Sequence, residues 1–329
     1  MSEEPILEVK NLVKHFPITS RGILLKKQVG VVHAVDGVSF SVGKGQTFGL
    51  VGESGCGKTS TARAILYLDP PTGGEVYFEG KNVDSIFKSK DHKEVLKLRR
   101  KMQYVFQNPY ASLDPRMTVA DIIMEPFMIH GHVPKNKWHD RLYELLKLVG
   151  LEDYHAERYP HEFSGGQRQR ICIARAIAVE PQLLIADEPV ASLDVSVRAQ
   201  ILNLLQELQQ KLKMTYLYIS HDLSTVRHIC HRVAVMYLGK LVEVSDTDEL
   251  FDSPLHPYTQ ALMSAIPVPN PDAETTRIVL PGEVPSPINP PAGCRFQPRC
   301  IHAKEHGCAE NVPELIDVGG GHMVACERA

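Results

Sequence analysis

Residues 52–59 read Gly52-Glu53-Ser54-Gly55-Cys56-Gly57-Lys58-Thr59 and fit the pattern G-x-x-x-x-G-K-[ST] at every fixed position. The apolar run 47–51 before them predicts a buried strand, and the run 60–66 after them predicts a helix. Glycines let the backbone turn until several N–H groups point at one anion, and a helix start adds its own free N–H groups. We therefore predict a nucleotide phosphate site. Lys58 reaches the β- and γ-phosphates, Thr59 binds Mg²⁺, and Ser60 lies in the same site.

Length and composition set the broad class of the protein. The 329 residues give room for one large domain and a smaller one. A net charge of −3 excludes the overall basic field that nucleic acid binding would need. No run approaches about 18 apolar residues and the N-terminus lacks a signal peptide's apolar core, so we expect any membrane role to go through a partner. Seven cysteines, an odd number, favour a reducing compartment and metal binding over disulfides.

Polar side chains follow three further runs that predict strands. They are Gln107 after 102–106, Asp187 and Glu188 after 183–186, and His221 after 215–220. Ligands in α/β proteins bind beyond the carboxyl ends of strands, so one sheet can bring these residues and the glycine-rich loop to one edge. Taken alone, each has an ordinary explanation: Gln107 as a surface residue, Asp187 and Glu188 as a helix cap, and His221 as a structural histidine. Because they follow the glycine-rich loop in this order, a functional interpretation is favoured. Asp187 is suited to bind Mg²⁺, and Gln107 can contact the metal or a water. Glu188 can polarise a water for attack on the γ-phosphate, which His221 can contact.

A second group of glycines opens another predicted helix, and it reads Ser164-Gly165-Gly166-Gln167. It is a second potential anion site. Asp194 stands just before a long amphipathic pattern at 197–212. The stretch 108–163 has a mainly helical pattern between strand-rich parts, so we expect a helical subdomain inserted into an α/β core.

The N-terminal part is rich in strand patterns. We predict strands or hairpins at 6–12, 32–42, 73–80 and 232–243, the last turning at Gly239, and a loop insertion at 19–31. Phe16 follows the first strand, where its ring can stack on a nucleobase or plug the strand end.

Together these motifs resemble the nucleotide-binding subunit of an ATP-binding-cassette (ABC) transporter over residues 6 to about 250. The resemblance implies an α/β, ABC-type P-loop NTPase core with an antiparallel β subdomain and the inserted helical subdomain. It makes 52–59 the Walker A loop, Gln107 the Q-loop residue, Glu188 the catalytic base, Asp194 a D-loop residue, His221 the H-loop residue and Phe16 the aromatic that stacks on adenine. Phe163 stands where Leu is usual before the signature 164–167, an apolar exchange.

The same resemblance implies a dimer in which each signature caps the ATP held on the other subunit's Walker A loop. The partner subunit is a related ATPase or a second copy of this chain. The helical subdomain is where such subunits grip two transmembrane permeases, which work with an extracytoplasmic solute-binding protein. The chain then lies at the cytoplasmic face of the inner membrane.

Prolines and four of the seven cysteines gather after residue 254, so we predict a domain boundary between 1–254 and 255–329. The cysteines are Cys294, Cys300, Cys308 and Cys326. Four thiolates can bind zinc or an iron–sulfur cluster, and the absence of a C-x-x-C pair weakens zinc. His302, His306 and His322 are nearby alternative ligands. The runs 253–259 and 293–300 resemble the extension of oligopeptide/dipeptide importers, which implies a [4Fe-4S] cluster on the four cysteines. Residues 17–22 and the insertion after them resemble the F-type subunit.

We therefore expect a subunit that hydrolyses ATP to power peptide import. Two alternatives stay open: the same machine for nickel or short sugars, and a soluble ABC ATPase without a transport role. A GTPase is excluded because Asn136-Lys137-Trp138-His139 has His where the guanine-reading motif needs Asp.

Overall fold

The structure, a computed structural model, describes residues 4–19, 28–266, 277–303 and 308–328. The chain divides into two compact units. Unit 1 comprises Met1–Ile6, Val42–Thr47 and Asp84–Ile219, and unit 2 comprises Leu7–Ser41, Phe48–Val83 and Ser220–Ala329. Unit 1 is therefore mainly one continuous segment, whereas unit 2 is assembled from three.

Unit 1 is built on three parallel strands, β6 (Met102–Val105), β7 (Leu183–Asp187) and β8 (Thr215–Ser220). All five residues of β7 are buried, as are all six of β8. Such uninterrupted apolar runs are typical of parallel strands that are covered on both faces. The register pairs Leu183 with Met102 on one side and with Thr215 on the other.

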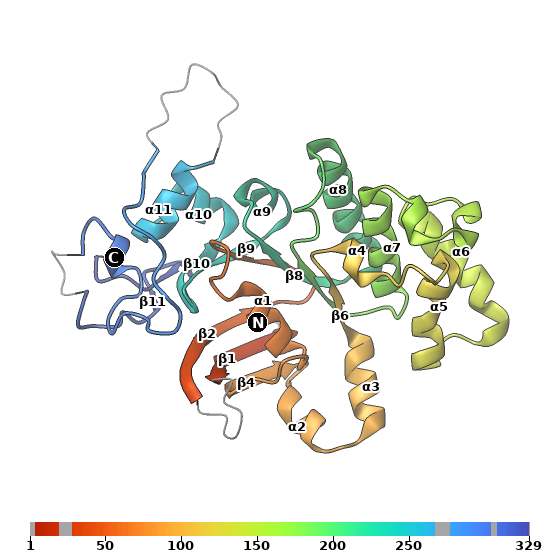
Figure 1. Ribbon diagram of the computed structural model, residues 1–329, viewed down its shortest axis with the longest axis horizontal. Helices are drawn as coiled ribbons and strands as arrows, with labels where there is room; N and C mark the ends of the chain where they lie inside the picture. Colours follow the sequence, from red (N-terminus) through yellow and green to blue (C-terminus); the bar gives the residue numbers. More distant parts are fainter. Residues whose placement is uncertain (1–3, 20–27, 267–276, 304–307, 329) are drawn as a thin grey trace. The chain divides into compact units, whose positions relative to one another are not determined.

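The helices of unit 1 include the predicted helical block and the two long helices after it (Figure 1). They are α2 (Val83–Lys88), α3 (His92–Lys101), α4 (Pro109–Ser112), α5 (Val119–His130), α6 (Trp138–Leu148), α7 (Gly165–Ile177) and α8 (Val195–Leu212), with 3-10 turns at Lys135–Lys137, Asp153–Glu157 and Pro160–Glu162. The start of α5 is fixed by a capping box between Thr118 and Asp121. Helices α5, α6 and α7 pack on one another, which confirms the mainly helical character of 108–163.

Unit 2 holds an antiparallel sheet in the order β2-β1-β4-β5 and a second group of strands in the order β11-β12-β10-β9-β3. Their bounds are β1 (Leu7–Thr19), β2 (Gln28–Val42), β3 (Thr47–Val51), β4 (Gly73–Phe78), β5 (Lys81–Asn82), β9 (Arg232–Tyr237), β10 (Lys240–Asp246), β11 (Ile316–Asp317) and β12 (Met323–Val324). Strand β3 runs parallel to β9. The hairpin β9–β10 turns at Gly239, where φ is 84°, as the sequence predicts.

The helices of unit 2 are α1 (Lys58–Ile65), α9 (Leu223–Ile229), α10 (Thr247–Asp252), α11 (Pro257–Ser264) and a 3-10 turn at Gln297–Arg299. Within this unit the cysteine-rich end of the chain supplies β12, which pairs with β10. The boundary at residue 254 stays a prediction. Across the described part of the chain, no helix is long and apolar enough to cross a membrane.

The predicted loop insertion at 19–31 is wrong at its ends. Strand β1 continues to Thr19 and β2 already begins at Gln28. Valine side chains at 29, 31 and 32 favour extended backbone because they are β-branched. The middle of the predicted loop, 20–27, lies outside the described residues.

Candidate functional site

The glycine-rich loop lies in unit 2, between β3 and α1, as the sequence predicts. Gly52 and Gly57 have φ angles of 151° and 110°, and a Cβ at either would clash with a backbone carbonyl of a neighbouring segment. These positions therefore need glycine. Lys58 is buried and its Nζ lies 2.8 Å from Gly52 O and 3.0 Å from Glu53 O. The ammonium group is thus held inside the curve of the loop, where the phosphates of a nucleotide are expected.

Glu53, within this loop, is held by residues from the far end of the chain. The Arg299 guanidinium donates to both carboxylate oxygens of Glu53, at 2.8 and 3.3 Å. The backbone N–H of Glu53 donates to the Tyr258 hydroxyl at 2.9 Å. Sequence reasoning missed Arg299 and Tyr258, because no local pattern links positions more than 200 residues apart.

Cys56 is a buried thiol in the same loop. Burial raises its pKa, against the opposing effect of the Lys58 charge. Its backbone oxygen accepts a hydrogen bond from Gly239 N at 2.8 Å. The thiol therefore stays protonated at neutral pH, and the backbone carbonyl helps to fix the loop.

In unit 1 the predicted catalytic residues are fixed by partners on neighbouring strands. Asp187 is 2 % exposed and accepts a hydrogen bond from the Tyr104 hydroxyl at 2.5 Å. Glu188 accepts from Gln107 Nε2 at 2.6 Å. The structure thus brings Gln107 and Glu188 together. Tyr104, on β6, was not predicted; its place one strand away from Asp187 is visible only once the strand order is known.

Glu188 has a left-handed backbone conformation, with φ of 47°. Non-glycine residues adopt this region rarely, and they do so most often at functional sites. The backbone N–H of Glu188 donates to Ile219 O at 2.9 Å, which continues the β7–β8 ladder by one residue and holds this conformation.

The second glycine group forms the start of α7 in unit 1. Ser164 Oγ accepts from Gln167 N at 3.3 Å and Gln167 Oε1 accepts from Ser164 N at 3.1 Å, a reciprocal capping box. A Cβ at Gly166 would clash with Val197 of α8. Ser164 is exposed, so an anion can approach these backbone N–H groups from solvent. Asp194, at the start of α8, is also exposed.

Two further predicted site residues, His221 and Phe16, belong to unit 2. His221 is exposed and follows β8 directly. Phe16 lies near the end of β1, half-buried, with the Lys14 ammonium 4.8 Å from the centre of its ring. The ring is thus partly open to solvent, and its predicted stacking on a nucleobase stays a prediction.

All seven cysteines are free thiols, and the four of the C-terminal segment lie close enough to influence one another's charge. Burial raises the pKa of Cys294 to about 11, and nearby Cys308 and Cys300 add to the rise. Cys294 N also donates to Cys308 O at 2.8 Å. Among the described residues, however, the only group of metal-ligand atoms within 4.8 Å of one another is formed by two histidines and an aspartate elsewhere in unit 2. The four thiols are therefore near one another without forming such a compact group.

The sequence also suggested histidines near the cysteines as alternative metal ligands. His322 is not directed to the thiols: its Nε2 lies 2.7 Å from Glu243 Oε1 and its Nδ1 3.2 Å from Glu249 Oε1. His322 is 3 % exposed, so its side chain is part of the buried interior of unit 2. His306 lies outside the described residues.

Comparisons with known proteins agree with these motifs. Residues 35–191 match the ABC transporter family, and residues 242–308 match the C-terminal region of oligopeptide/dipeptide transporters. The chain is 52 % identical to the oligopeptide transport ATP-binding protein AppF of Bacillus subtilis, over 99 % of this chain and 98 % of that protein. It is 48 % identical to the dipeptide transport ATP-binding protein DppF of Escherichia coli, over 98 % of this chain and 94 % of that protein.

Solved structures share the fold. The ATP-binding cassette MJ0796, as a dimer in a post-hydrolysis state bound to ADP and Pi, matches with a TM-score of 0.63 and 28 % identity over 73 % of this chain and 98 % of that one. The protein cbiO1 of Clostridium perfringens, part of an ABC transporter complex, matches with a TM-score of 0.63 and 27 % identity over 76 % and 92 % of the two chains. This chain therefore belongs to the ABC transporter family, as an ATP-binding protein of the oligopeptide/dipeptide transport group.

Proposed function

We propose that this chain hydrolyses ATP to power the import of di- and oligopeptides through separate permease subunits. The observation that carries the proposal is the pairing of Glu188 with Gln107 at 2.6 Å, directly after the strand that ends in Asp187. A carboxylate fixed in this way by an amide is suited to polarise a water molecule. The family and its named relatives, which are peptide transport proteins, favour peptides over nickel or sugars.

Each residue of the site has a separate task in this proposal. Glu188 takes a proton from the attacking water, and His221 contacts the γ-phosphate. Lys58 and the loop N–H groups hold the β- and γ-phosphates. Thr59, Asp187 and Gln107 are the oxygen ligands for Mg²⁺, which neutralises phosphate charge during the reaction. Asp187 fits this task because it is a buried carboxylate oriented by Tyr104.

We further propose that the working unit is a dimer with a related ATPase subunit or with a second copy. The signature residues 164–167 and Asp194 act on the ATP held by the partner. Exposure supports this: Ser164 and Asp194 face solvent, and Val195 beside them is 80 % exposed. A polar helix start next to an exposed apolar side chain suits a surface that a second subunit covers.

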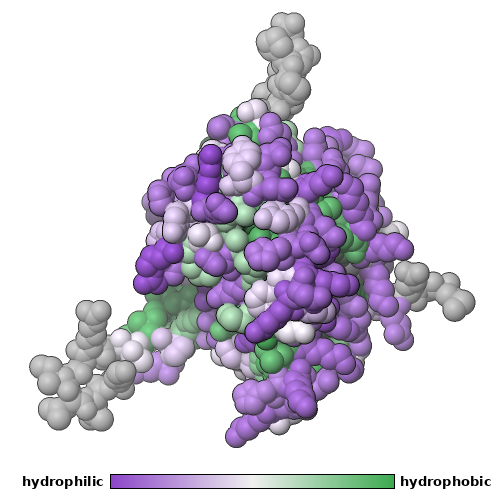
Figure 2. Space-filling view, turned by 90° about the vertical axis from the view of Figure 1, so that its right-hand side faces the viewer, coloured by the Kyte–Doolittle hydropathy of each residue, from purple (hydrophilic) through white to green (hydrophobic). Residues whose placement is uncertain are grey.

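We propose that the helical block 108–163 binds the permease partners. The chain would then lie at the cytoplasmic face of the inner membrane as a peripheral subunit. Several large apolar side chains of this block are exposed: Tyr110, Met128, Ile129, Tyr143, Tyr154 and Tyr159. Figure 2 shows a face on which small hydrophobic patches interrupt a mostly hydrophilic surface. Aromatic and methionine side chains are enriched at protein interfaces, so the block suits a protein partner.

Within 255–329 we propose a [4Fe-4S] cluster on Cys294, Cys300, Cys308 and Cys326. The four thiols lie near one another, the C-x-x-C pair typical of zinc sites is missing, and a cluster accepts one thiolate at each of four irons. Protein purified without oxygen should be brown, with broad absorption near roughly 400 nm. Replacing Cys308 by Ser should remove the colour, whereas Cys230→Ser should keep it; colourless protein with one zinc per chain contradicts the assignment.

The transport proposal is tested by co-expression with candidate permeases. Two polytopic membrane proteins should co-purify with the chain, and vesicles containing the complex should take up peptide only with ATP. Capture of soluble partners alone contradicts a transport role, and ATP-dependent uptake of nickel or sugar in place of peptide corrects the solute.

A further inference from the structure

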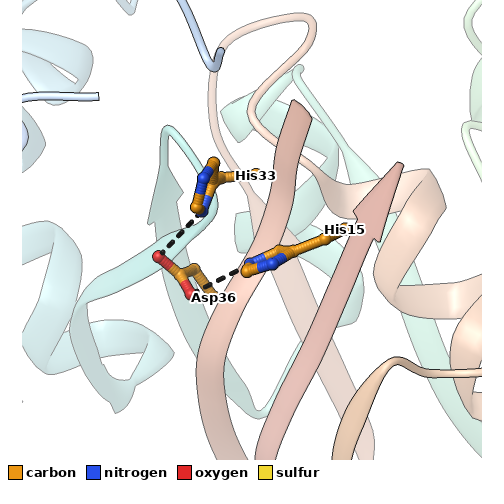
Figure 3. Close-up of side chains that lie close together, drawn as sticks. All are labelled: His15, His33 and Asp36. Carbon is orange, nitrogen blue, oxygen red and sulfur yellow. Dashed lines mark hydrogen bonds and ion pairs between the residues drawn. The ribbon is translucent and has the colours of Figure 1, made fainter. Parts of the chain in front are cut away.

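Three side chains with metal-binding atoms meet between β1 and β2 in unit 2 (Figure 3). His15 comes from β1, and His33 and Asp36 come from β2. His15 Nε2 lies 3.2 Å from Asp36 Oδ1, and His33 Nδ1 lies 3.7 Å from Asp36 Oδ2. All three ligand atoms lie within 4.8 Å of one another.

The position of His33 distinguishes a metal site from an ordinary hydrogen-bonded cluster. Its Nδ1 is buried and has no hydrogen-bond partner, and 3.7 Å is too long for a hydrogen bond to Asp36. Two ligands held about 2.0–2.1 Å from one tetrahedral ion lie about 3.3–3.4 Å apart. The distances of 3.2 and 3.7 Å lie on either side of that value. An ion between the three side chains would satisfy the buried nitrogen.

The backbone on which these ligands stand is fixed independently of them. His33 N donates to Pro287 O and Asp36 N donates to Gly239 O, both at 2.9 Å. Arg295, which is 7 % exposed, pairs with Asp36 Oδ2 and orients the carboxylate. Outer contacts of this kind hold ligand side chains ready for an ion. The positive charge of Arg295 also opposes a cation, so the site should bind with moderate affinity.

We propose that His15, His33 and Asp36 bind one divalent transition-metal ion of the zinc class. Two imidazoles and one carboxylate favour such ions over Mg²⁺ and Ca²⁺, which prefer oxygen ligands alone. Three protein ligands leave at least one position for water or another ligand. The side chains of the three residues are 25–30 % exposed, so an ion can enter from solvent. This site shares no ligand with the proposed cluster of the four cysteines or with the proposed Mg²⁺ site.

The test uses the full-length, reduced protein without oxygen, titrated with Zn²⁺ and with Co²⁺. His33→Ala should remove one equivalent of Zn²⁺, or weaken that binding step tenfold or more, because it removes a ligand. It should fold normally, since His33 Nδ1 has no hydrogen-bond partner and the side chain is 30 % exposed. The matched control is His139→Ala, which removes an exposed histidine of α6 and should bind as the wild type does.

Because the four C-terminal cysteines are the other proposed metal ligands of the chain, a spectroscopic signature separates the two sites. In His33→Ala, the broad absorption near roughly 400 nm of the proposed iron–sulfur cluster should be unchanged. In His33→Cys, one further thiolate band should appear as Co²⁺ fills the altered site. Unchanged zinc stoichiometry and affinity in His33→Ala, or no new band in folded His33→Cys, would overturn the proposal and leave the three side chains as a hydrogen-bonded anchor.

Discussion

Arg299 holds Glu53 in a two-pronged ion pair, with the two guanidinium N–H groups 2.8 and 3.3 Å from the carboxylate oxygens. Arg299 is the residue before Cys300, and Glu53 is the second residue of the glycine-rich loop. The cysteine-rich segment and the nucleotide loop are therefore joined by a direct contact inside unit 2.

Arg299→Ala should weaken ATP binding about threefold to tenfold, because the loop loses the contact that positions Glu53. The pair is only partly buried, with Glu53 30 % exposed, so a contribution of about 1 kcal/mol is expected. Equilibrium binding of a fluorescent ATP analogue measures it. Glu53→Gln should have a similar effect, and the double variant should be no worse than either single variant. Fully additive losses would show that the two residues act separately.

Glu188→Gln should lower ATP turnover by a factor of about 100 or more, because an amide cannot accept the proton of the attacking water. ATP affinity should stay close to that of the wild type, and nucleotide-bound dimers should accumulate on size exclusion. Glu180→Gln, which changes an exposed carboxylate of the same unit, is the control and should hydrolyse ATP normally. Normal turnover in Glu188→Gln would remove Glu188 from the role of base.

Tyr104→Phe should raise the Mg²⁺ concentration needed for half-maximal ATPase activity severalfold. The change removes the hydroxyl that donates to Asp187 at 2.5 Å, so the carboxylate loses its orientation. Tyr216→Phe is the matched control: it removes a buried hydroxyl on β8 that donates to Leu205 O at 2.8 Å, and it should affect stability alone. Equal Mg²⁺ dependence in the two variants would show that Tyr104 has only a structural role.

His256 should make unit 2 sensitive to acid. Burial lowers the pKa of this histidine to about 3, and its Nδ1 accepts a hydrogen bond from Tyr258 N at 3.1 Å, which requires an unprotonated nitrogen. The unfolded chain takes up this proton near its ordinary pKa of about 6.5, so the stabilisation is present above that pH and is lost as the pH falls from 6.5 towards 3.

Between pH 7.5 and 5.5 this single group should cost about 1.4 kcal/mol of unfolding free energy. His256→Asn keeps a helix-capping side chain without titrating in this range, so its urea midpoint should fall less over the same interval. A parallel fall in both proteins would locate the acid sensitivity elsewhere.

Features whose sequence signal lies within a few neighbouring residues could be predicted from the sequence. The continuous apolar runs of β7 and β8, the glycine turn between β9 and β10 and the capped start of α7 all have signals within a few residues. The glycine-rich loop and the order of the polar residues after the strands indicated the chemistry for the same reason.

What the sequence could not predict are contacts between distant segments. Tyr104 meets Asp187 across 83 positions, and Arg299 meets Glu53 across 246. His15 and His33 come from different strands, and nothing in either strand pattern distinguishes them from surface histidines. Such pairs depend on strand order and chain reversal, which local periodicity does not encode.

The pairing of β12 with β10 has a consequence for the order in which the chain acquires its structure. Glu243 of β10 lies opposite Val324 of β12, about 80 positions later in the chain. During synthesis, the long segment 84–219 of unit 1 is complete before this partner strand exists, and β10 has an open edge for the time needed to make about 80 residues. Open strand edges invite pairing with other chains. A chain that lacks β12 should therefore be the aggregation-prone form of this protein, because β10 then has no partner strand on that edge.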